Sequence, residues 1–121
     1  MANPFVHVEL TTSDTDKAKS FYGALFGWKL EDVEMAPGFT YTMIRVGEGT
    51  GGGMMKTPAP SVPTAWLPYV LVDDVVAATA KAKSLGATVM KDVTEITNAG
   101  SFSVILDPTG AAIGLWQPKA K

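Results

Sequence analysis

Alternating apolar and polar residues near the start of the chain predict a strand whose two faces differ in character. Successive side chains of a strand point to opposite faces of a sheet. One face of residues 5–10 therefore carries Val6, Val8 and Leu10. The other face carries Phe5, His7 and Glu9. His7 is the only histidine of the chain, and it could be a metal ligand, a catalytic base or a hydrogen-bonded polar residue.

Two segments carry the spacing of apolar residues that is typical of one buried helical stripe. In residues 13–27 the stripe consists of Ala18, Phe21, Tyr22 and Leu25. In residues 73–86 it consists of Val75, Ala78, Ala82 and Leu85. The expected caps of the first turns are Ser13 or Asp14 and Asp73 or Asp74, because their side chains accept from free backbone N–H groups. Gly27 and Gly86 are placed to end the helices.

The two helices belong to two copies of one longer pattern. Residues 7–14 align with residues 67–74 at an offset of 60, and residues 41–49 align with residues 102–110 at an offset of 61. Each copy reads strand, helix, strand, strand, strand. Because the repeat is long and occurs only twice, it indicates a duplicated module and not a solenoid.

This pattern predicts an α+β fold in a single domain, residues 1–121. Its modules, residues 1–57 and 64–121, are joined by the proline-rich linker 58–63, which can continue neither a helix nor a central strand. Each βαβββ module would place its helix on the apolar face of a four-stranded mixed sheet. We expect Val6, Val8 and Leu10 beneath the first helix, and Val70 and Val72 beneath the second.

The opposite faces of the two sheets would form a cup-shaped mixed sheet, with the helices on its convex side. A concave surface of this kind is the usual shape of a small-molecule site. The run Gly51–Gly53 lacks the spacing of a phosphate-binding loop, so we expect a bulge or a close backbone approach there.

The composition narrows the range of expected binding partners. Hydrophobic residues make up 46% of the chain and charged residues 18%, which favours a packed core over disorder. The net charge is −2 and the isoelectric point is near 5.2, so we expect no nucleic-acid partner. There is no cysteine, which excludes disulfides, thiol chemistry and cysteinyl metal sites.

No stretch approaches the roughly 20 apolar residues that cross a bilayer, and the N-terminus has no signal-peptide pattern. We therefore expect a soluble, cytoplasmic protein with no membrane partner. Small size and exposed strand edges favour a homodimer.

Several motifs taken in order resemble the vicinal oxygen chelate superfamily, which includes glyoxalase I, extradiol dioxygenases, fosfomycin-resistance enzymes and bleomycin-resistance proteins. The motifs are "FYGALFGWKL" (21–30), "VDDVVAATAKAKSLGA" (72–87) and "DPTGAAIGLWQP" (107–118). The resemblance spans essentially the whole chain and implies the double βαβββ arrangement.

The resemblance also implies where a metal would be held. Active members of the superfamily bind a divalent metal with His, Glu or Gln from the first and fourth strands of each module. The matching positions are His7, Gly53, Leu67 and Gly114. Glycine and leucine supply no donor atom, whereas catalytic zinc sites typically use about three protein ligands. We expect no catalytic metal and no cofactor, and we expect the two glycines to enlarge the cavity.

The remaining inward-facing side chains predict a binding site for a small molecule. The expected contacts are His7, Glu9, Tyr41, Arg45, Met55, Leu67, Tyr69 and Trp116. Aromatic rings offer flat apolar surfaces, and His7 with Glu9 would orient a polar group. Plainer interpretations stay open: His7 as a hydrogen-bonded strand residue, Arg45 as a solvated residue at a strand end, and Tyr69 and Trp116 as core or dimer-interface residues.

Three functions remain on this evidence. The first is a metal-independent protein of the glyoxalase and bleomycin-resistance type that binds a small hydrophobic or aromatic molecule. The second is an enzyme, a lyase or isomerase related to glyoxalase I, with His7 and Glu9 as catalytic candidates. The third is a non-catalytic assembly or accessory subunit.

Overall fold

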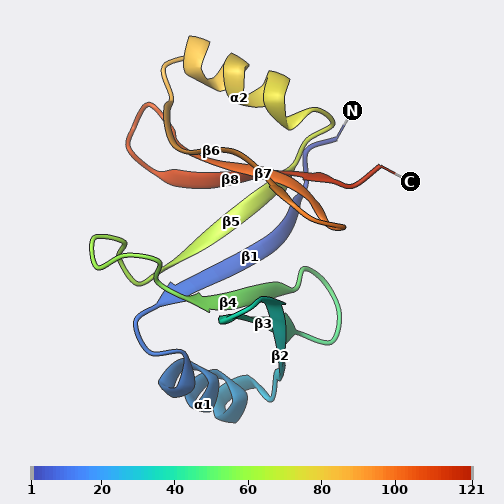
Figure 1. Cartoon of the computed structure of the whole chain (residues 1–121), viewed down its shortest axis with the longest axis vertical. Helices are drawn as coiled ribbons and strands as arrows, with labels where there is room; N and C mark the ends of the chain where they lie inside the picture. Colours follow the sequence, from blue (N-terminus) through green and yellow to red (C-terminus); the bar gives the residue numbers. More distant parts are fainter. Residues whose placement is uncertain (1, 121) are drawn as a thin grey trace. The chain divides into compact units, whose positions relative to one another are not determined.

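The computed structural model describes residues 2–120, which fold as two compact units (Figure 1). The first unit consists of residues 7–67. The second consists of the chain from Pro68 onward together with the N-terminal residues up to Val6. The predicted α+β class and the two βαβββ modules are confirmed, since strand, helix and three further strands follow one another twice.

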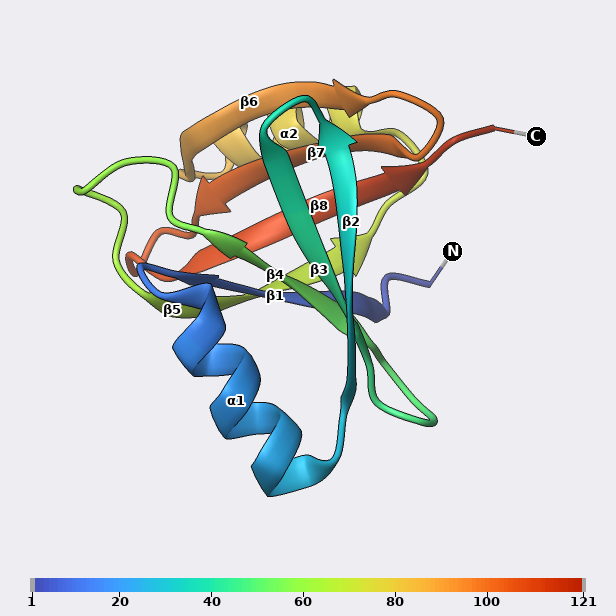
Figure 2. The ribbon, with the colours of Figure 1, turned by 60° about the horizontal axis from the view of Figure 1, so that its bottom comes forward.

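The first module contains five elements. They are β1 (Phe5–Thr12), α1 (Thr15–Phe26), β2 (Lys29–Ala36), β3 (Phe39–Arg45) and β4 (Gly52–Lys56). The strands lie in the order β2-β3-β4-β1, with β1 parallel to β4 and the other neighbours antiparallel. In Figure 2 the chain passes from the end of α1 directly into the β2–β3 hairpin.

The second module repeats this connectivity. Its elements are β5 (Ala65–Leu71), α2 (Val75–Ser84), β6 (Thr88–Ile96), β7 (Gly100–Leu106) and β8 (Ala112–Pro118). The strand order is β5-β8-β7-β6, with β5 parallel to β8. Glu9 pairs with Gly53 in the first sheet, and Tyr69 pairs with Gly114 in the second. These two pairs differ by 60 and 61 residues, so the strand register confirms the internal alignment of the sequence.

The helix ends follow the sequence closely. The Asp14 side chain accepts from the backbone N–H of Lys17 at 3.0 Å, and the Asp74 side chain accepts from that of Ala77 at 3.1 Å. Both satisfy donors that the first turn leaves unpaired. Gly27 ends α1 in the left-handed region (φ 69°), which glycine adopts without steric cost. The caps at Asp14, Asp74 and Gly27 are therefore confirmed.

The predicted stripe of α1 is only half right. Ala18 and Tyr22 pack against the buried cluster of Leu10, Ile44 and Met54. Phe21 and Leu25 instead remain exposed, each at 57%. In α2, Val75 is buried and Ala78 and Ala82 pack beside it, but Leu85 lies at the helix end and is exposed.

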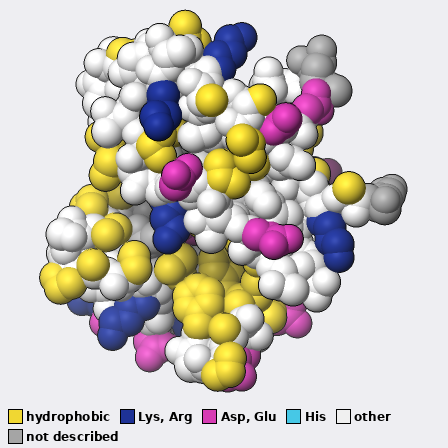
Figure 3. Space-filling model, turned by 45° about the horizontal axis from the view of Figure 1, so that its top comes forward, with side chains coloured by type: hydrophobic (Ala, Val, Ile, Leu, Met, Phe, Trp, Pro, Cys, Tyr) yellow, Lys and Arg dark blue, Asp and Glu magenta, His cyan; other side chains and the backbone are white. Residues whose placement is uncertain are grey.

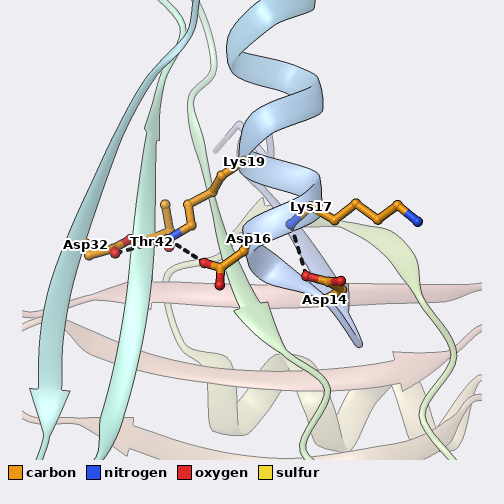
Figure 4. A network of polar contacts seen from close by, with 6 residues as sticks. All are labelled: Asp14, Asp16, Lys17, Lys19, Asp32 and Thr42. Carbon is orange, nitrogen blue, oxygen red and sulfur yellow. Dashed lines mark hydrogen bonds and ion pairs between the residues drawn. The ribbon is translucent and has the colours of Figure 1, made fainter.

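Polar contacts fasten α1 to the edge of its sheet (Figure 4). The Lys19 ammonium donates to Asp32 of β2 at 3.1 Å, and the Thr42 hydroxyl of β3 donates to the same carboxylate at 2.7 Å. These hydrogen bonds from Thr42 and Lys19 stabilise the charged carboxylate and lower the pKa of Asp32. The helix is thus positioned by one charged contact in addition to its apolar stripe.

A buried pair of hydroxyls lies beneath α2. Thr79 Oγ1 donates to the carbonyl of Val75 at 2.5 Å and lies 2.8 Å from Ser103 Oγ on β7. Both side chains are buried beside Val75, Ile105 and Leu115. Because the Thr79 proton points to Val75, Ser103 is the donor of the bond between the two hydroxyls. Each buried donor is therefore satisfied.

This pair allows a direct test of the second core. Thr79→Val keeps the shape of the side chain but removes the acceptor of the Ser103 hydroxyl, and a buried donor without a partner costs about 1–3 kcal/mol. We expect the free energy of unfolding, measured by urea denaturation, to fall by that amount. Adding Ser103→Ala to Thr79→Val should recover part of the loss. A neutral Thr79→Val variant would contradict this assignment.

Candidate functional site

Three polar side chains form a connected group on the face of the first sheet opposite α1. The Tyr41 hydroxyl donates to Glu9 Oε1 at 2.9 Å, and His7 Nε2 lies 2.8 Å from the same hydroxyl oxygen. His7 and Glu9 come from β1, whereas Tyr41 comes from β3. We call these three residues the polar chain.

Tyr41 reaches β1 because the intervening strand has no side chain in its path. Strand β4 lies between β3 and β1, and Gly53 of β4 pairs with Glu9 on one side and Met43 on the other. A Cβ atom at position 53 would collide with the ring and the hydroxyl of Tyr41. The absence of a side chain there is thus a geometric requirement of the polar chain.

The hydrogen bonds fix the protonation of the polar chain. A tyrosine hydroxyl has one proton, and here it is directed at the Glu9 carboxylate. The Tyr41 oxygen therefore accepts from His7, which places the imidazole proton on Nε2 and the lone pair on Nδ1. Burial lowers the pKa of His7 from its ordinary value near 6.5, so the imidazole is neutral at pH 7.

The equivalent positions of the second module carry apolar and aromatic side chains. By the internal alignment, Leu67, Tyr69 and Phe102 correspond to His7, Glu9 and Tyr41. The rings of Tyr69 and Phe102 meet edge to face, with centroids 6.2 Å apart and planes inclined by 70°. Trp116 of β8 pairs with Phe102 and lies against Gly100. An aromatic surface thus replaces the polar chain.

The expectation that Gly53 and Gly114 enlarge a cavity is wrong. A Cβ atom at position 114 would collide with the ring of Tyr69, just as one at position 53 would collide with Tyr41. In each module a tyrosine from a neighbouring strand fills the space beside the glycine.

The residues at the expected metal positions do not fit a metal. His7 supplies one nitrogen donor, and its Nε2 already pairs with Tyr41, while Gly53, Leu67 and Gly114 supply none. Within residues 2–120, no three His, Cys, Asp or Glu side chains lie close enough together to hold a metal ion.

The other residues predicted for the site lie in varied surroundings. Met55 is half-buried on the face of Gly53. Arg45 lies at the exposed end of β3 and pairs with Glu31 at 2.9 Å, which supports its interpretation as a surface residue. Tyr69 is buried and Trp116 is half-buried. Hydrogen bonds join His7, Glu9 and Tyr41 to one another.

The sequence did not reveal how Tyr41 bridges His7 and Glu9. It placed Tyr41 among the expected ligand contacts, whereas the structure brings the Tyr41 hydroxyl to the Glu9 carboxylate. The signal that could have revealed this was the glycine at position 53. On a central strand, a missing side chain often marks the close approach of another group. Gly52 shows the same effect, since a Cβ there would collide with the Val8 carbonyl, and the predicted close backbone approach is confirmed.

The tandem βαβββ modules define an α+β protein of the class that includes glyoxalases. Residues 5–115 match the family model described as the Glyoxalase/Bleomycin resistance protein/Dioxygenase superfamily. The chain belongs to this superfamily. Over 110 residues it is 37% identical to proteins named "Putative glyoxylase CFP32" from Mycobacterium bovis and Mycobacterium tuberculosis. The match covers 91% of this chain but only 42% of those relatives.

Solved structures share the fold at low sequence identity. A hypothetical protein, BH1468, from Bacillus halodurans superposes with a TM-score of 0.75 at 13% identity, covering 100% of this chain and 98% of that one. Methylmalonyl-CoA epimerase from Mycobacterium tuberculosis superposes with a TM-score of 0.69 at 19% identity. The superposition covers 96% of this chain and 88% of that one. These likenesses show the fold alone. No helix within residues 2–120 is long and apolar enough to span a membrane.

Gly53→Ala tests whether Tyr41 needs the missing side chain. The added methyl group would force the ring of Tyr41 aside, and overpacking of this kind costs about 1–3 kcal/mol of unfolding free energy. The matched control is Gly23→Ala in α1, where the new methyl would contact Leu30 at 3.9 Å and should stabilise the helix by about 0.5–1 kcal/mol. In a Tyr41→Ala background the cost of Gly53→Ala should largely disappear. An equal cost in both backgrounds would argue against this packing.

The lowered pKa of His7 predicts how stability depends on pH. Between the folded pKa and about 6.5, the unfolded chain binds a proton more readily than the folded chain, so stability falls as pH drops through 6.5. The lowered pKa values of Asp32 and Asp107 affect only more acidic conditions. Urea denaturation at pH 7.5, 6.5 and 5.5 should show this loss in the wild type. His7→Gln should flatten it, and parallel curves for the two proteins would refute the prediction.

Proposed function

We propose that this chain binds a small hydrophobic or aromatic molecule that carries a polar group, and that it does so without a catalytic metal. The observation that carries the proposal is the bridge by Tyr41, which holds a neutral imidazole and a carboxylate in one connected group. Such an arrangement gives one polar anchor of fixed orientation, which ligand sites commonly place within apolar walls.

The chemistry of the anchor restricts the ligand. The carboxylate of Glu9 can accept more than one hydrogen bond, so the polar chain favours a ligand that donates, such as a hydroxyl or an N–H. Met55 offers adaptable apolar contact, since its thioether is flexible and polarisable.

A proton-transfer reaction is the second candidate, and the same polar chain favours it. If His7 took a proton at Nδ1, the imidazolium would donate through Nε2 to Tyr41, whose hydroxyl donates to the Glu9 carboxylate. The negative charge of Glu9 would stabilise that state. His7 would be the general base of a lyase or isomerase, with Tyr41 and Glu9 as positioning residues. Relatives named putative glyoxylase agree with this candidate.

The binding proposal is tested with two tyrosine variants. We would screen phenols, naphthols and aromatic alcohols, together with nickel, zinc and manganese ions, by thermal shift, because a ligand stabilises the folded chain according to its concentration over Kd. Tyr41→Phe removes the bridging hydroxyl. Hydrogen bonds to charged groups contribute about 1.5–3 kcal/mol, so we expect affinity for a compound identified in the screen to fall about 10- to 100-fold.

Tyr22→Phe is the matched control, since Tyr22 lies in α1 and packs beside Ile44 and Met54, away from the polar chain. It should bind as the wild type does. Equal affinity of Tyr41→Phe and wild type would overturn the proposed anchor, and stoichiometric stabilisation by a metal ion would overturn its metal-independent character. Turnover of the bound compound that His7→Gln abolishes would select the enzyme.

A further inference from the structure

The β2–β3 hairpin turns polar side chains toward its own helix. Asp32 of β2 pairs with Thr42 of β3 on the α1 side of the sheet, where Lys19 donates to the Asp32 carboxylate. The next pair on that face, Glu34 with Thr40, is polar as well. In Figure 2 the two strands run side by side as far as the turn between them. Beyond the part that α1 covers, the helix side of this hairpin is therefore polar.

The opposite face of the same hairpin is apolar. Successive side chains of a strand alternate between the two faces, so Val33 and Tyr41, which pair across the hairpin, lie on the face of the polar chain. Phe39 and Met43 lie two positions to either side of Tyr41 on β3 and share that face. Sheets normally turn their apolar side chains toward whatever covers them. The pattern therefore indicates that this face is covered by something other than α1.

Two of these apolar side chains are open to solvent. Phe39 is 40% exposed and Val33 is 36% exposed, while Met43 is half-buried. We call Val33, Phe39 and Met43 the hairpin wall. Figure 3 shows that hydrophobic side chains gather most densely on the lower part of the face drawn there, so exposed apolar surface is not spread evenly over the molecule. The hairpin wall thus has apolar surface that the chain itself leaves partly uncovered.

The fold does not require the hairpin wall. By the internal alignment, Tyr41 corresponds to Phe102, and the residue that pairs with Phe102 in the second module is Thr94. Phe39 corresponds to Gly100 at the same offset of 61. The second hairpin forms with a polar residue and a glycine at the places of the two exposed apolar residues. Closing the hairpin therefore does not explain why the first module carries them.

We propose that the hairpin wall binds the apolar tail of the molecule whose polar group the polar chain holds, and that this ligand is therefore elongated. The inference rests on the proposed function and adds the shape of the ligand to it. The Tyr41 ring joins the two parts, because its hydroxyl lies in the polar chain and Val33 pairs with it from the other side. Met43 continues the surface, since it pairs with Gly53, the glycine that the same ring covers.

The strand order sets the length of the ligand. The polar chain reaches β1 and Val33 lies on β2, so three strand spacings of about 4.8 Å, roughly 14 Å in all, separate the two ends of the proposed site. A single aromatic ring spans only part of this path. A phenol with a linear alkyl chain matches it, since the phenol hydroxyl can donate to the anchor while the methylenes lie along the hairpin wall.

The end of the hairpin is fixed before a ligand arrives. Pro37 and Gly38 occupy the turn, and Gly38 has a positive φ of 79°, which suits the third position of a tight turn that has proline at its second. A register shift between Glu34 and Ala36 marks a β-bulge beside the turn. Bulges are over-represented at sheet edges and next to active sites, where they redirect side chains. A preorganised surface of this kind loses little conformational entropy on binding.

The test uses phenol and 4-alkylphenols with linear chains of increasing length up to heptyl, titrated by isothermal calorimetry. A buried methylene changes Kd by up to about fourfold, so the wild-type Kd should fall steadily along the series. Phe39→Ala and Val33→Ala should each weaken binding of 4-heptylphenol by at least about fivefold, because each removes apolar contact with the tail. Binding of phenol itself should stay unchanged in both variants.

Phe21→Ala is the matched control, since Phe21 is also an exposed phenylalanine but lies on α1, at the opposite face of the sheet. It should bind every member of the series as the wild type does. Circular dichroism would confirm folding of the three variants. Nuclear magnetic resonance of labelled methionine methyl groups gives the location: 4-heptylphenol should shift the signal of Met43 and leave that of Met90, which is exposed on β6 of the second module.

The outcomes separate this inference from the proposed function. If Tyr41→Phe weakens the whole series but neither hairpin variant alters the dependence on chain length, the proposed function stands and the role of the hairpin wall is refuted. If no member binds, or if Tyr41→Phe changes nothing, both fail. Light scattering tests another occupant, because a dimer that Phe39→Ala dissociates would assign the hairpin wall to a second copy of the chain and overturn the inference.

Discussion

The steric requirement at Gly53 is the constraint on which the candidate site depends. Only a residue without a side chain lets the Tyr41 ring cross β4 and place its hydroxyl between His7 and Glu9. The consequences are electrostatic as well as geometric. The hydroxyl holds the imidazole in one tautomer, and burial keeps that imidazole neutral. A missing methyl group on one strand thereby determines a hydrogen-bond partner of a side chain on another.

Duplication has given two sheets of the same design with different chemistry. Both modules pair the first and fourth strands in parallel, and both place a tyrosine ring beside a glycine at the position of an expected metal ligand. In the first module the surrounding positions carry a histidine, a glutamate and a tyrosine. In the second they carry a leucine, a tyrosine and a phenylalanine.

The two helices are held in different ways. Helix α2 buries Val75 and a pair of satisfied hydroxyls against its sheet. Helix α1 buries none of its residues fully, and it depends on a narrow contact of Ala18 and Tyr22 and on the charged tie between Lys19 and Asp32. Phe21, Leu25 and Phe26, on the opposite flank of α1, remain exposed to solvent.

The sequence by itself determined the modules, the helix caps at Asp14, Asp74 and Gly27, the internal alignment and the superfamily. These features follow from local periodicity and local hydrogen bonding, which depend on residues a few positions apart. Only the tertiary structure decided that Tyr41 bridges His7 and Glu9, that tyrosine rings fill the space beside Gly53 and Gly114, and that Phe21 and Leu25 stay exposed. Each of these depends on the pairing of strands distant in sequence or on how much of a helix its sheet covers. Neither can be predicted from the local pattern of residues.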